Sequence, residues 1–220
     1  MKKVIIFGTG DLAQVAHFYL THDSSYEIVA FTANKKYIKE NELFKLPVVS
    51  FEEVEKNYPP DKFAIFIAIG YKNVNKLRAK IYVEAKEKGY ELISYVNSKV
   101  TKWGQTEIGD NCFILENQVI QPFVKIGSDV IIWSGNHIGH HSVIGDHCFI
   151  TSHVVISGNV KIGPYCFIGV NATLRDGITI ARECVIGAGS LILKNTKEKG
   201  IYTTKPAELR SMNSSKLKNL

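Results

Sequence analysis

Two residues eighteen positions apart could together perform acyl transfer. His140 is followed at this spacing by Gly158, within the sequence VISGNV at residues 155–160. An imidazole can remove a proton from an attacking amine or hydroxyl, and a glycine leaves its backbone N–H open to a developing oxyanion. If the fold stacks these two positions, they supply the base and the oxyanion donor of an acyl-transfer reaction.

A second signal, near the N-terminus, could bind phosphate. The sequence GTGDLA at residues 8–13 is a near match to the fingerprint that brings backbone close to phosphate at a helix N-terminus. Dinucleotide folds need an acidic residue at the end of the second strand, whereas residues 31–34 read FTAN. The region before the hexads, residues 1–96, is also too short for a full dinucleotide fold. A nucleotide-sugar diphosphate is therefore favoured over NAD, and a purely structural glycine turn is the alternative.

The elements that would position these residues follow from an aliphatic residue that recurs every six positions. A period of six fits neither a helix nor one long strand, and it indicates the short strands and regular corners of a hexapeptide β-helix. Three hexads make one coil, so residues eighteen apart should lie above one another. The repeat runs without insertion through Ile108, Ile114, Ile120, Ile126, Ile132, Ile138, Ile144, Ile150, Ile156, Ile162, Ile168, Leu174, Ile180, Ile186 and Ile192.

The residue four positions after each of these also points inward and is mostly small or β-branched. Gln118 and Asn136 depart from this rule, so they are either stacked amides of the core or marks of a distorted rung. All four cysteines, Cys112, Cys148, Cys166 and Cys184, occupy this inward position. No two are close enough for a CxxC motif, so we expect reduced structural thiols.

Five histidines between residues 137 and 153 raise the question of zinc. They are His137, His140, His141, His147 and His153. Their positions within the hexads differ, and His147 and His153 should lie on other faces of the prism than His141. A closed zinc site needs four ligands at fixed geometry. We therefore expect no metal site.

Residues 1–96 alternate between strand-like and helix-like segments. Apolar runs at 3–7, 26–33, 62–69 and 91–96 predict strands, and segments 12–20, 51–58 and 74–88 predict helices. This alternation is typical of a small parallel sheet with helices on both faces. Ligands of such sheets bind beyond the carboxyl ends of the strands. Here those ends carry the GTGD turn and the GYK sequence at 70–72.

The composition, with 45% hydrophobic and 22% charged residues among 220, is that of an ordinary globular protein. The net charge of +6 is mild, and no basic helix or aromatic–basic interleaving supports nucleic-acid binding. The sequence has no signal-peptide pattern and no apolar run long enough to span a bilayer. We therefore expect a cytoplasmic protein without a nucleic-acid partner or an integral membrane segment.

The chain resembles the bacterial sugar acyltransferases of the sialic acid O-acetyltransferase type, a hexapeptide-repeat family that includes N-acetyltransferases of nucleotide-linked amino sugars. The resemblance covers nearly the whole chain. It rests on GTG at 8–10, AIG at 68–70 with Arg78 downstream, the hexads, and KPA at 205–207. It implies an α/β N-terminal domain with a small Rossmann-like parallel sheet (1–97), an all-β left-handed parallel β-helix (98–205) and a C-terminal tail (206–220).

The resemblance also implies the site residues. The family's base opens a His-Asp/Glu-Cys-Val-Ile-Gly stretch, which corresponds to HHSVIG at 140–145, so His140 is implied as the base. His141 replaces the family's acidic neighbour, which leaves His140 without the partner that the family provides. Asn136, Asp146 or a residue of a neighbouring subunit could take the missing role.

Further residues are implied around the two substrates. Gly158 would meet the thioester carbonyl, and CoA would lie along Gly169, Val170, Gly187, Ala188, Lys194 and Lys205, although exposed lysines need no ligand. The nucleotide of the sugar would bind Gly8, Thr9, Gly10, Asp11, Gly70 and Tyr71. Asn34, in place of the family's frequent aspartate, leaves the nucleobase open.

The family assembles as a homotrimer with the acyl donor between subunits. Phe123, Trp133 and Phe149 point outward by hexad phase, and we expect them at such an interface. The implied activity is acetyl-CoA-dependent N-acetylation of a nucleotide-linked amino sugar in bacterial surface glycan biosynthesis. O-acetylation of a sialic-acid-like sugar is the alternative reaction. A non-catalytic scaffold and a nucleotide-binding regulator are the alternatives from other classes.

Overall fold

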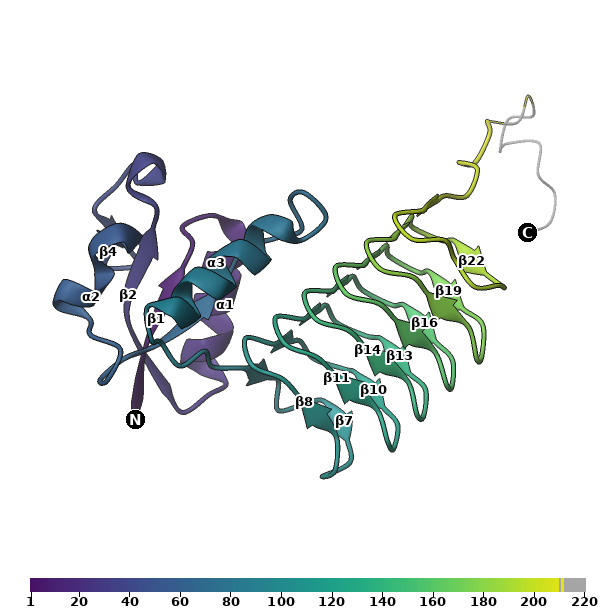
Figure 1. The fold of residues 1–220 in the computed structure, drawn as a ribbon, viewed down its shortest axis with the longest axis horizontal. Helices are drawn as coiled ribbons and strands as arrows, with labels where there is room; N and C mark the ends of the chain where they lie inside the picture. Colours follow the sequence, from purple (N-terminus) through teal and green to yellow (C-terminus); the bar gives the residue numbers. More distant parts are fainter. Residues whose placement is uncertain (210, 212–220) are drawn as a thin grey trace.

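The fold comes from a computed structural model that describes residues 1–209 and 211. An α/β domain lies on one side of a β-helix whose coils stack along one axis (Figure 1). The expected architecture, a small parallel α/β domain followed by a hexapeptide β-helix, is confirmed. Most of the predicted tail, residue 210 and residues 212–220, lies outside the described residues.

The N-terminal sheet has five strands in the order β3-β4-β2-β1-β5. Only β3 runs antiparallel to its neighbour, at the edge of the sheet. The parallel strands are short and apolar because helices cover both of their faces. The strands are β1 (Lys2–Phe7), β2 (Tyr26–Ala33), β3 (Glu42–Leu43), β4 (Leu46–Ser50) and β5 (Ala64–Ile67).

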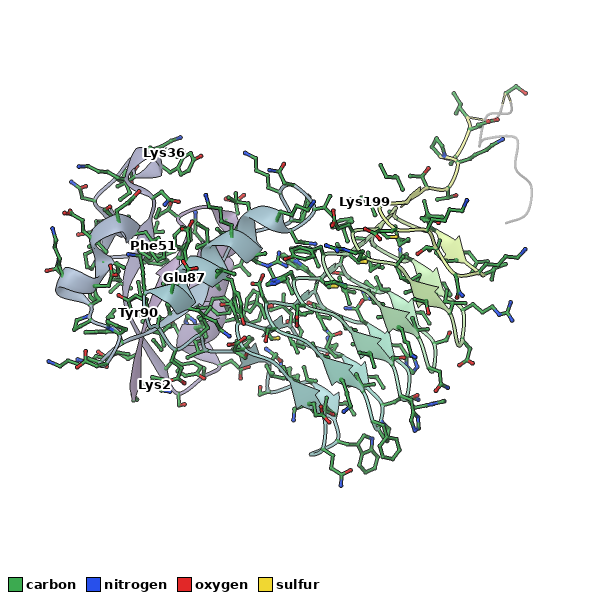
Figure 2. The ribbon with its side chains drawn as sticks, viewed as in Figure 1. Lys2, Lys36, Phe51, Glu87, Tyr90 and Lys199 are labelled. Atoms are coloured by element: carbon green, nitrogen blue, oxygen red, sulfur yellow. The ribbon has the colours of Figure 1, made fainter. Side chains whose placement is uncertain are left out.

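Helix α1 (Asp11–His22) buries Ala13, Ala16 and Leu20 on one face of the sheet. Helix α3 (Lys76–Glu87) packs on the other face, where the short helices η2 (Phe51–Glu53) and α2 (Val54–Asn57) also lie. The helix η1 (Lys35–Tyr37) follows β2. Figure 2 places Phe51 and Tyr90 inside this domain, and both are buried. The predicted helices therefore exist, with α3 beginning two residues later than expected.

The last strand predicted at 91–96 divides between the two domains. Leu92 makes only an isolated bridge to Ile65. Tyr95 and Val96 instead form β6, which pairs with β9 of the β-helix. A short apolar run carries no information about which of two sheets it joins, and this one links them.

The β-helix has three faces, each a parallel ladder of two-residue strands. Face 1 contains β6 (Tyr95–Val96), β9 (Phe113–Ile114), β12 (Ile131–Ile132), β15 (Phe149–Ile150), β18 (Phe167–Ile168), β21 (Val185–Ile186) and β23 (Ile201–Tyr202). Face 2 contains β7 (Thr101–Lys102), β10 (Val119–Ile120), β13 (His137–Ile138), β16 (Val155–Ile156), β19 (Thr173–Leu174) and β22 (Leu191–Ile192). Face 3 contains β8 (Glu107–Ile108), β11 (Lys125–Ile126), β14 (Val143–Ile144), β17 (Lys161–Ile162) and β20 (Thr179–Ile180).

Neighbouring strands on a face are eighteen residues apart, as the hexads predict, except β21 and β23, in which Val185 is opposite Ile201. His137 is opposite Val155, for example, and Val143 is opposite Lys161. The repeating aliphatic residues fill the interior together with the four cysteines, which are free and fully buried. Burial raises the pKa of Cys112 to about 12 and raises that of Cys148. A hydrogen bond with Cys148 lowers the pKa of Cys166. All four thiols are fully buried, so they serve as core residues and are out of reach of a substrate.

Gln118 and Asn136 form a stacked pair of core amides, which resolves the two alternatives for this pair. The Gln118 side-chain oxygen accepts a hydrogen bond from the backbone N–H of Asn136 at 3.1 Å. The Asn136 side-chain oxygen in turn accepts one from the N–H of Val154 at 2.6 Å. Each amide therefore bonds to the coil above it, and the rung is regular.

One corner position of each hexad adopts left-handed backbone. It carries positive φ in His141, His147 and His153 and, six residues at a time, in Asn111, Asn117, Phe123, Asp129, Gly135, Asn159, Tyr165, Asn171, Gly177, Glu183 and Gly189. Asn, Asp, His and Gly tolerate this conformation best. The backbone therefore explains why histidines gather at this position. Among the described residues no group of three or more His, Cys, Asp or Glu could hold a metal ion.

The N-terminal domain covers the coils of face 1 that come first in the sequence. Phe113, Ile131 and Phe149 point outward from this face and are buried in the same cluster as α1. The expectation that Phe149 faces another subunit is wrong, because this domain buries it. Trp133 is half-buried against the same cluster, and its place at an interface stays a prediction. The position of a residue within the hexad shows that its side chain points out of the β-helix, but it does not show which part of the protein covers that side chain. Phe123 alone of the three is exposed, at 58%.

In the part of the chain that is described, no helix has the length and apolar character needed to cross a membrane.

Candidate functional site

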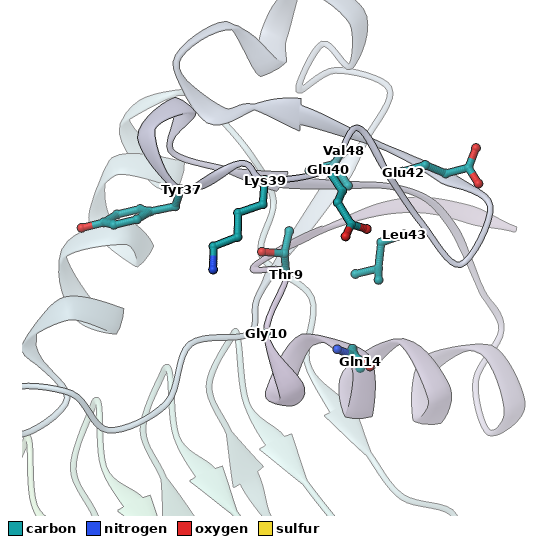
Figure 3. A pocket seen from close by; sticks show the side chains of 9 residues that line it. All are labelled: Thr9, Gly10, Gln14, Tyr37, Lys39, Glu40, Glu42, Leu43 and Val48. Carbon is teal, nitrogen blue, oxygen red and sulfur yellow. The ribbon is translucent and has the colours of Figure 1, made fainter.

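The glycine turn after β1 borders a cavity of about 350 Å³. Thr9 and Gly10 line it from the turn, Gln14 lines it from α1, and segment 37–48 closes it from the other side (Figure 3). Lys39 extends toward the turn, and the Glu40 carboxylate points into the cavity. The turn sits at the N-terminus of a twelve-residue helix, where backbone N–H groups favour an anion.

Gly8 and Asp11 flank this turn without lining the cavity. Gly8 has a φ of 126°, and a Cβ there would lie 2.8 Å from the carbonyl oxygen of Ala68. A glycine is therefore required for strand packing, whatever binds nearby. Asp11 is the first residue of α1 and is exposed. The segment 37–48, which supplies most of the cavity wall, was missed because its residues form no recognisable motif.

Gly70 and Tyr71 do not line the cavity but lie at the junction of the two domains. The Tyr71 ring packs against Phe149 at 5.0 Å and Phe167 at 4.9 Å between ring centroids. The carbonyl oxygen of Gly70 accepts a hydrogen bond from Arg78 at 3.3 Å. Both residues are therefore placed by contacts with the β-helix and with α3.

Arg78 is the centre of a fully buried polar network at this junction. Its guanidinium donates to the side chains of Asp129 and Asn75, both at 3.1 Å, and to the carbonyl oxygens of residues 129, 147 and 148. Asp129 also accepts from Asn111 at 2.7 Å and pairs with His147 at 2.8 Å. A buried charge needs such partners. The network fixes α3 on the β-helix. The family resemblance singled out Arg78, but the sequence did not indicate the partners that it finds in the β-helix.

His140 and Gly158 meet as predicted, at the corner between faces 2 and 3. A Cβ placed on Gly158 would lie 2.7 Å from Cε1 and Nε2 of His140. The imidazole therefore covers the space that a side chain at this glycine would fill. Backbone bonds hold the corners in register, because the N–H of Asn159 donates to the carbonyl of His140 at 2.8 Å. The His140 side chain is exposed, whereas Gly158 is buried.

His141 contacts His140 through its ring. The two Nδ1 atoms are 3.1 Å apart, so one ring donates a hydrogen bond and the other accepts it. The tautomer of His140 that accepts at Nδ1 carries its proton on Nε2, and the other leaves Nε2 free to act as a base. His141 also packs on Phe123 at 4.6 Å. Asn136 is inside the core and Asp146 binds the N–H of Ser128, so neither serves His140.

Asp176 lies on the far side of Gly158 from His140. Its Oδ1 is 2.9 Å from the same Cβ position. Asp176 is thirty-six residues beyond His140, or two coils, and this spacing was the signal that could have identified it. The corner therefore stacks an imidazole, a glycine and a carboxylate.

The residues expected to line CoA divide between two edges of the prism. Gly169, Val170, Gly187 and Ala188 lie at the corners between faces 1 and 2. Lys194 follows β22 and lies eighteen residues beyond Asp176, on the His140 edge. Lys205 is exposed beyond the last strand. A Cβ on Gly169 would lie 2.5 Å from the backbone N of Ala188, so coil packing alone requires that glycine.

Two family models match the chain. Residues 105–139, 123–158 and 159–194 match the bacterial transferase hexapeptide (six repeats), and residues 3–85 match the PglD N-terminal domain. The matched segments coincide with the β-helix and with most of the α/β domain. They account for both halves of the chain.

Solved structures share the whole fold. PerB from Caulobacter crescentus, in complex with CoA and GDP-perosamine, is 22% identical with a TM-score of 0.83, over 96% of this chain and 98% of that one. The acetyltransferase domain of PglB from Neisseria gonorrhoeae is 23% identical with a TM-score of 0.81, over 94% and 99%. WeeI from Acinetobacter baumannii is 18% identical with a TM-score of 0.59, over 92% and 96%.

The likeness to these structures establishes the arrangement of the two domains, and the family models identify each domain by its sequence. The resemblance inferred from the glycine turn and the hexads is confirmed. The chain combines the bacterial transferase hexapeptide repeats with a PglD N-terminal domain, in the fold that PerB and PglB also have.

Proposed function

We propose that this protein transfers an acetyl group from acetyl-CoA to the amino group of a nucleotide-linked amino sugar, with His140 as the general base. The observation that carries this proposal is the imidazole of His140 stacked over Gly158 on an exposed edge of the β-helix. PerB, of the same fold, is bound to CoA and GDP-perosamine, and the PglB domain is bound to acetyl coenzyme A. As part of this proposal, we assign the reaction to bacterial surface glycan biosynthesis and the protein to the cytoplasm.

The reaction proceeds by direct transfer. His140 takes a proton from the acceptor amine as its lone pair attacks the thioester carbonyl carbon. The backbone N–H of Gly158 stabilises the oxyanion of the tetrahedral intermediate. The carbon–sulfur bond then breaks, and the CoA thiolate leaves and is protonated. No cysteine takes part, since all four are buried in the core.

The nucleotide of the acceptor occupies the cavity beside the turn at Thr9 and Gly10. The diphosphate lies at the N-terminus of α1, where Lys39 adds a positive charge. Gly70 and Tyr71 then lie between this cavity and the β-helix, on the side toward which the sugar extends.

One chain alone does not join this cavity to His140. The N-terminal domain covers face 1, whereas His140 lies at the corner opposite that face, between faces 2 and 3. We therefore assign the complete site to two neighbouring subunits of a homotrimer, one supplying the nucleotide cavity and the other His140.

Face 2 supports this assembly. Val119, Val155 and Leu191 point outward from it with 44%, 40% and 61% of their surfaces exposed. Parallel packing on this face brings the edge with Gly169 and Gly187 of one subunit toward the edge with His140 and Lys194 of the next. The CoA arm lies in the cleft between these edges, and Lys194 and Lys205 meet its phosphates.

The test is thiol release from acetyl-CoA with a panel of UDP-, dTDP-, GDP- and CMP-linked sugars, including 3-amino and 4-amino sugars. Release with one amino sugar is expected and identifies the nucleotide. His140→Ala should lower kcat by about 100-fold or more, the contribution of a general base. Release only with hydroxyl acceptors would make the enzyme an O-acetyltransferase. Near-wild-type turnover by the variant, in a trimer that binds both substrates, would exclude His140 as the base.

A further inference from the structure

Asp176 has a position that the acyl-transfer mechanism has not used. It follows β19 at the corner between faces 2 and 3, two coils from His140. Only the missing side chain of Gly158 separates the two groups, since the same Cβ position lies 2.7 Å from the imidazole and 2.9 Å from the carboxylate. The imidazole and the carboxylate therefore meet over the Cα of Gly158, at the position that a side chain there would take.

The carboxylate is free to bind a ligand. Among the described side chains Asp176 has neither a hydrogen-bond partner nor an ion-pair partner within 4.0 Å, and it is exposed. The charged and titratable groups around it are His140, His141, Arg175 and Lys194. Arg175 donates to the carbonyl of Leu193, away from the imidazole. Lys194 lies on the adjacent coil of the same edge, eighteen residues beyond Asp176, without an ion pair to it among the described residues.

Resting on the proposed function, we propose that Asp176 binds the ammonium form of the acceptor amine and so directs this site to amines and not to hydroxyls. At neutral pH an amino sugar is largely protonated, and a carboxylate accepts a charge-assisted hydrogen bond from it. A hydroxyl carries no charge and gains less from the same contact. Asp176 is thus a substrate-binding residue that determines specificity.

The proton balance agrees with this placement. The ammonium is held by Asp176 and transfers one proton to Nε2 of His140, and the resulting amine attacks the thioester carbonyl. An amide bond forms, the carbon–sulfur bond breaks, and CoA takes up a proton as it leaves. The reaction releases one proton overall. The Asp176 carboxylate also stabilises the imidazolium that exists between these two steps.

The test is the pH profile of kcat/KM for the amino sugar in Asp176→Asn. We expect kcat/KM to fall about tenfold near pH 7, through a higher KM for the sugar, while the KM for acetyl-CoA stays unchanged. The deficit should shrink as the pH rises above the pKa of the acceptor amine, because the free amine no longer needs the carboxylate. A structural role would give a deficit that does not change with pH.

Glu107→Gln is the matched control, because it removes one exposed carboxylate from β8, on face 3. Its profile should match that of the wild type. If His140→Ala is inactive but Asp176→Asn equals the wild type at every pH, the inference about Asp176 is wrong and the proposed function stands. If the wild type acetylates only hydroxyl acceptors, both are wrong.

Discussion

At the scale of single residues, the site depends on one missing side chain. Gly158 is buried and lies between His140 and Asp176, whose side chains close over the position that its Cβ would take. The φ of Gly158 is not in the left-handed region, so an alanine there is excluded by its neighbours and not by its own backbone. A substitution of this glycine therefore tests a steric requirement of the site and leaves the backbone conformation of the fold unchanged.

Gly158→Ala should therefore lower activity more than stability. The new methyl group would displace the ends of two exposed side chains, which costs the fold little but moves the base. We expect kcat to fall at least tenfold, because a displacement of about 1 Å can cost about 100-fold in rate. Thermal unfolding and thiol release measured together check this. Gly104→Ala is the control, because a Cβ there meets nothing within 4 Å. Unchanged kcat would show that the base does not act from the observed position.

The histidine at position 141 has two separate explanations, one from the site and one from the backbone. Its sequence neighbours indicated the position of the family's acid, and its ring does contact His140. Its type, however, also suits the left-handed corner that it shares with His147 and His153. A histidine at such a corner can therefore be present because it tolerates left-handed backbone. A search for metal ligands or catalytic bases would take it for a functional residue.

At the scale of elements, α3 is attached to the β-helix by a polar network and not by apolar contacts alone. Arg78 and Asp129 are both fully buried, and their contacts reach the loop that contains Gly70. Three residues of this loop, Asn73, Val74 and Asn75, have positive φ. Such a conformation persists only where the surroundings hold it. Asn75 provides part of that support through bonds to the carbonyls of Tyr165 and Cys166.

Arg78→Met should destabilise the protein strongly. It leaves the Asp129 carboxylate buried without its main cation, for which the cost is about 3–5 kcal/mol. The free energy of unfolding, measured in urea, checks this value. Arg78→Met combined with Asp129→Asn should recover part of the loss, because no charge then remains buried. If the single and the double variants lose the same stability, the ion pair is not what holds the junction.

At the scale of the whole molecule, the exposed apolar residues of face 2 should hold three subunits together. Val155→Glu would place three charges in the contact, so we expect a monomer in analytical ultracentrifugation. That monomer should also lose acetyl transfer, because its nucleotide cavity and His140 then belong to no common site. Lys161→Glu on face 3 is the control and should remain trimeric. A trimer that survives Val155→Glu would locate the interface elsewhere.

The sequence predicted the repetitive part of this molecule far better than the junction between its domains. A six-residue period determines each β-helix position, so the stacking of His140 on Gly158 followed from counting. The cavity wall at 37–48, the network of Arg78 and the cover over Phe149 depend on contacts between segments far apart in the chain. No local pattern records such contacts. Asp176 is intermediate, because its spacing from His140 was visible in the sequence but the approach of its carboxylate to Gly158 was not.

The unbroken eighteen-residue coil constrains how this protein can change in length. Removing one residue from any coil would turn every later inward side chain outward, whereas removing a whole coil leaves all faces aligned. Each coil adds one strand spacing, about 4.8 Å. The edge that carries His140 can therefore grow or shrink only in steps of this size. Among descendants of this sequence, insertions and deletions within the β-helix should occur in multiples of eighteen residues, or as loops that leave and re-enter at one corner.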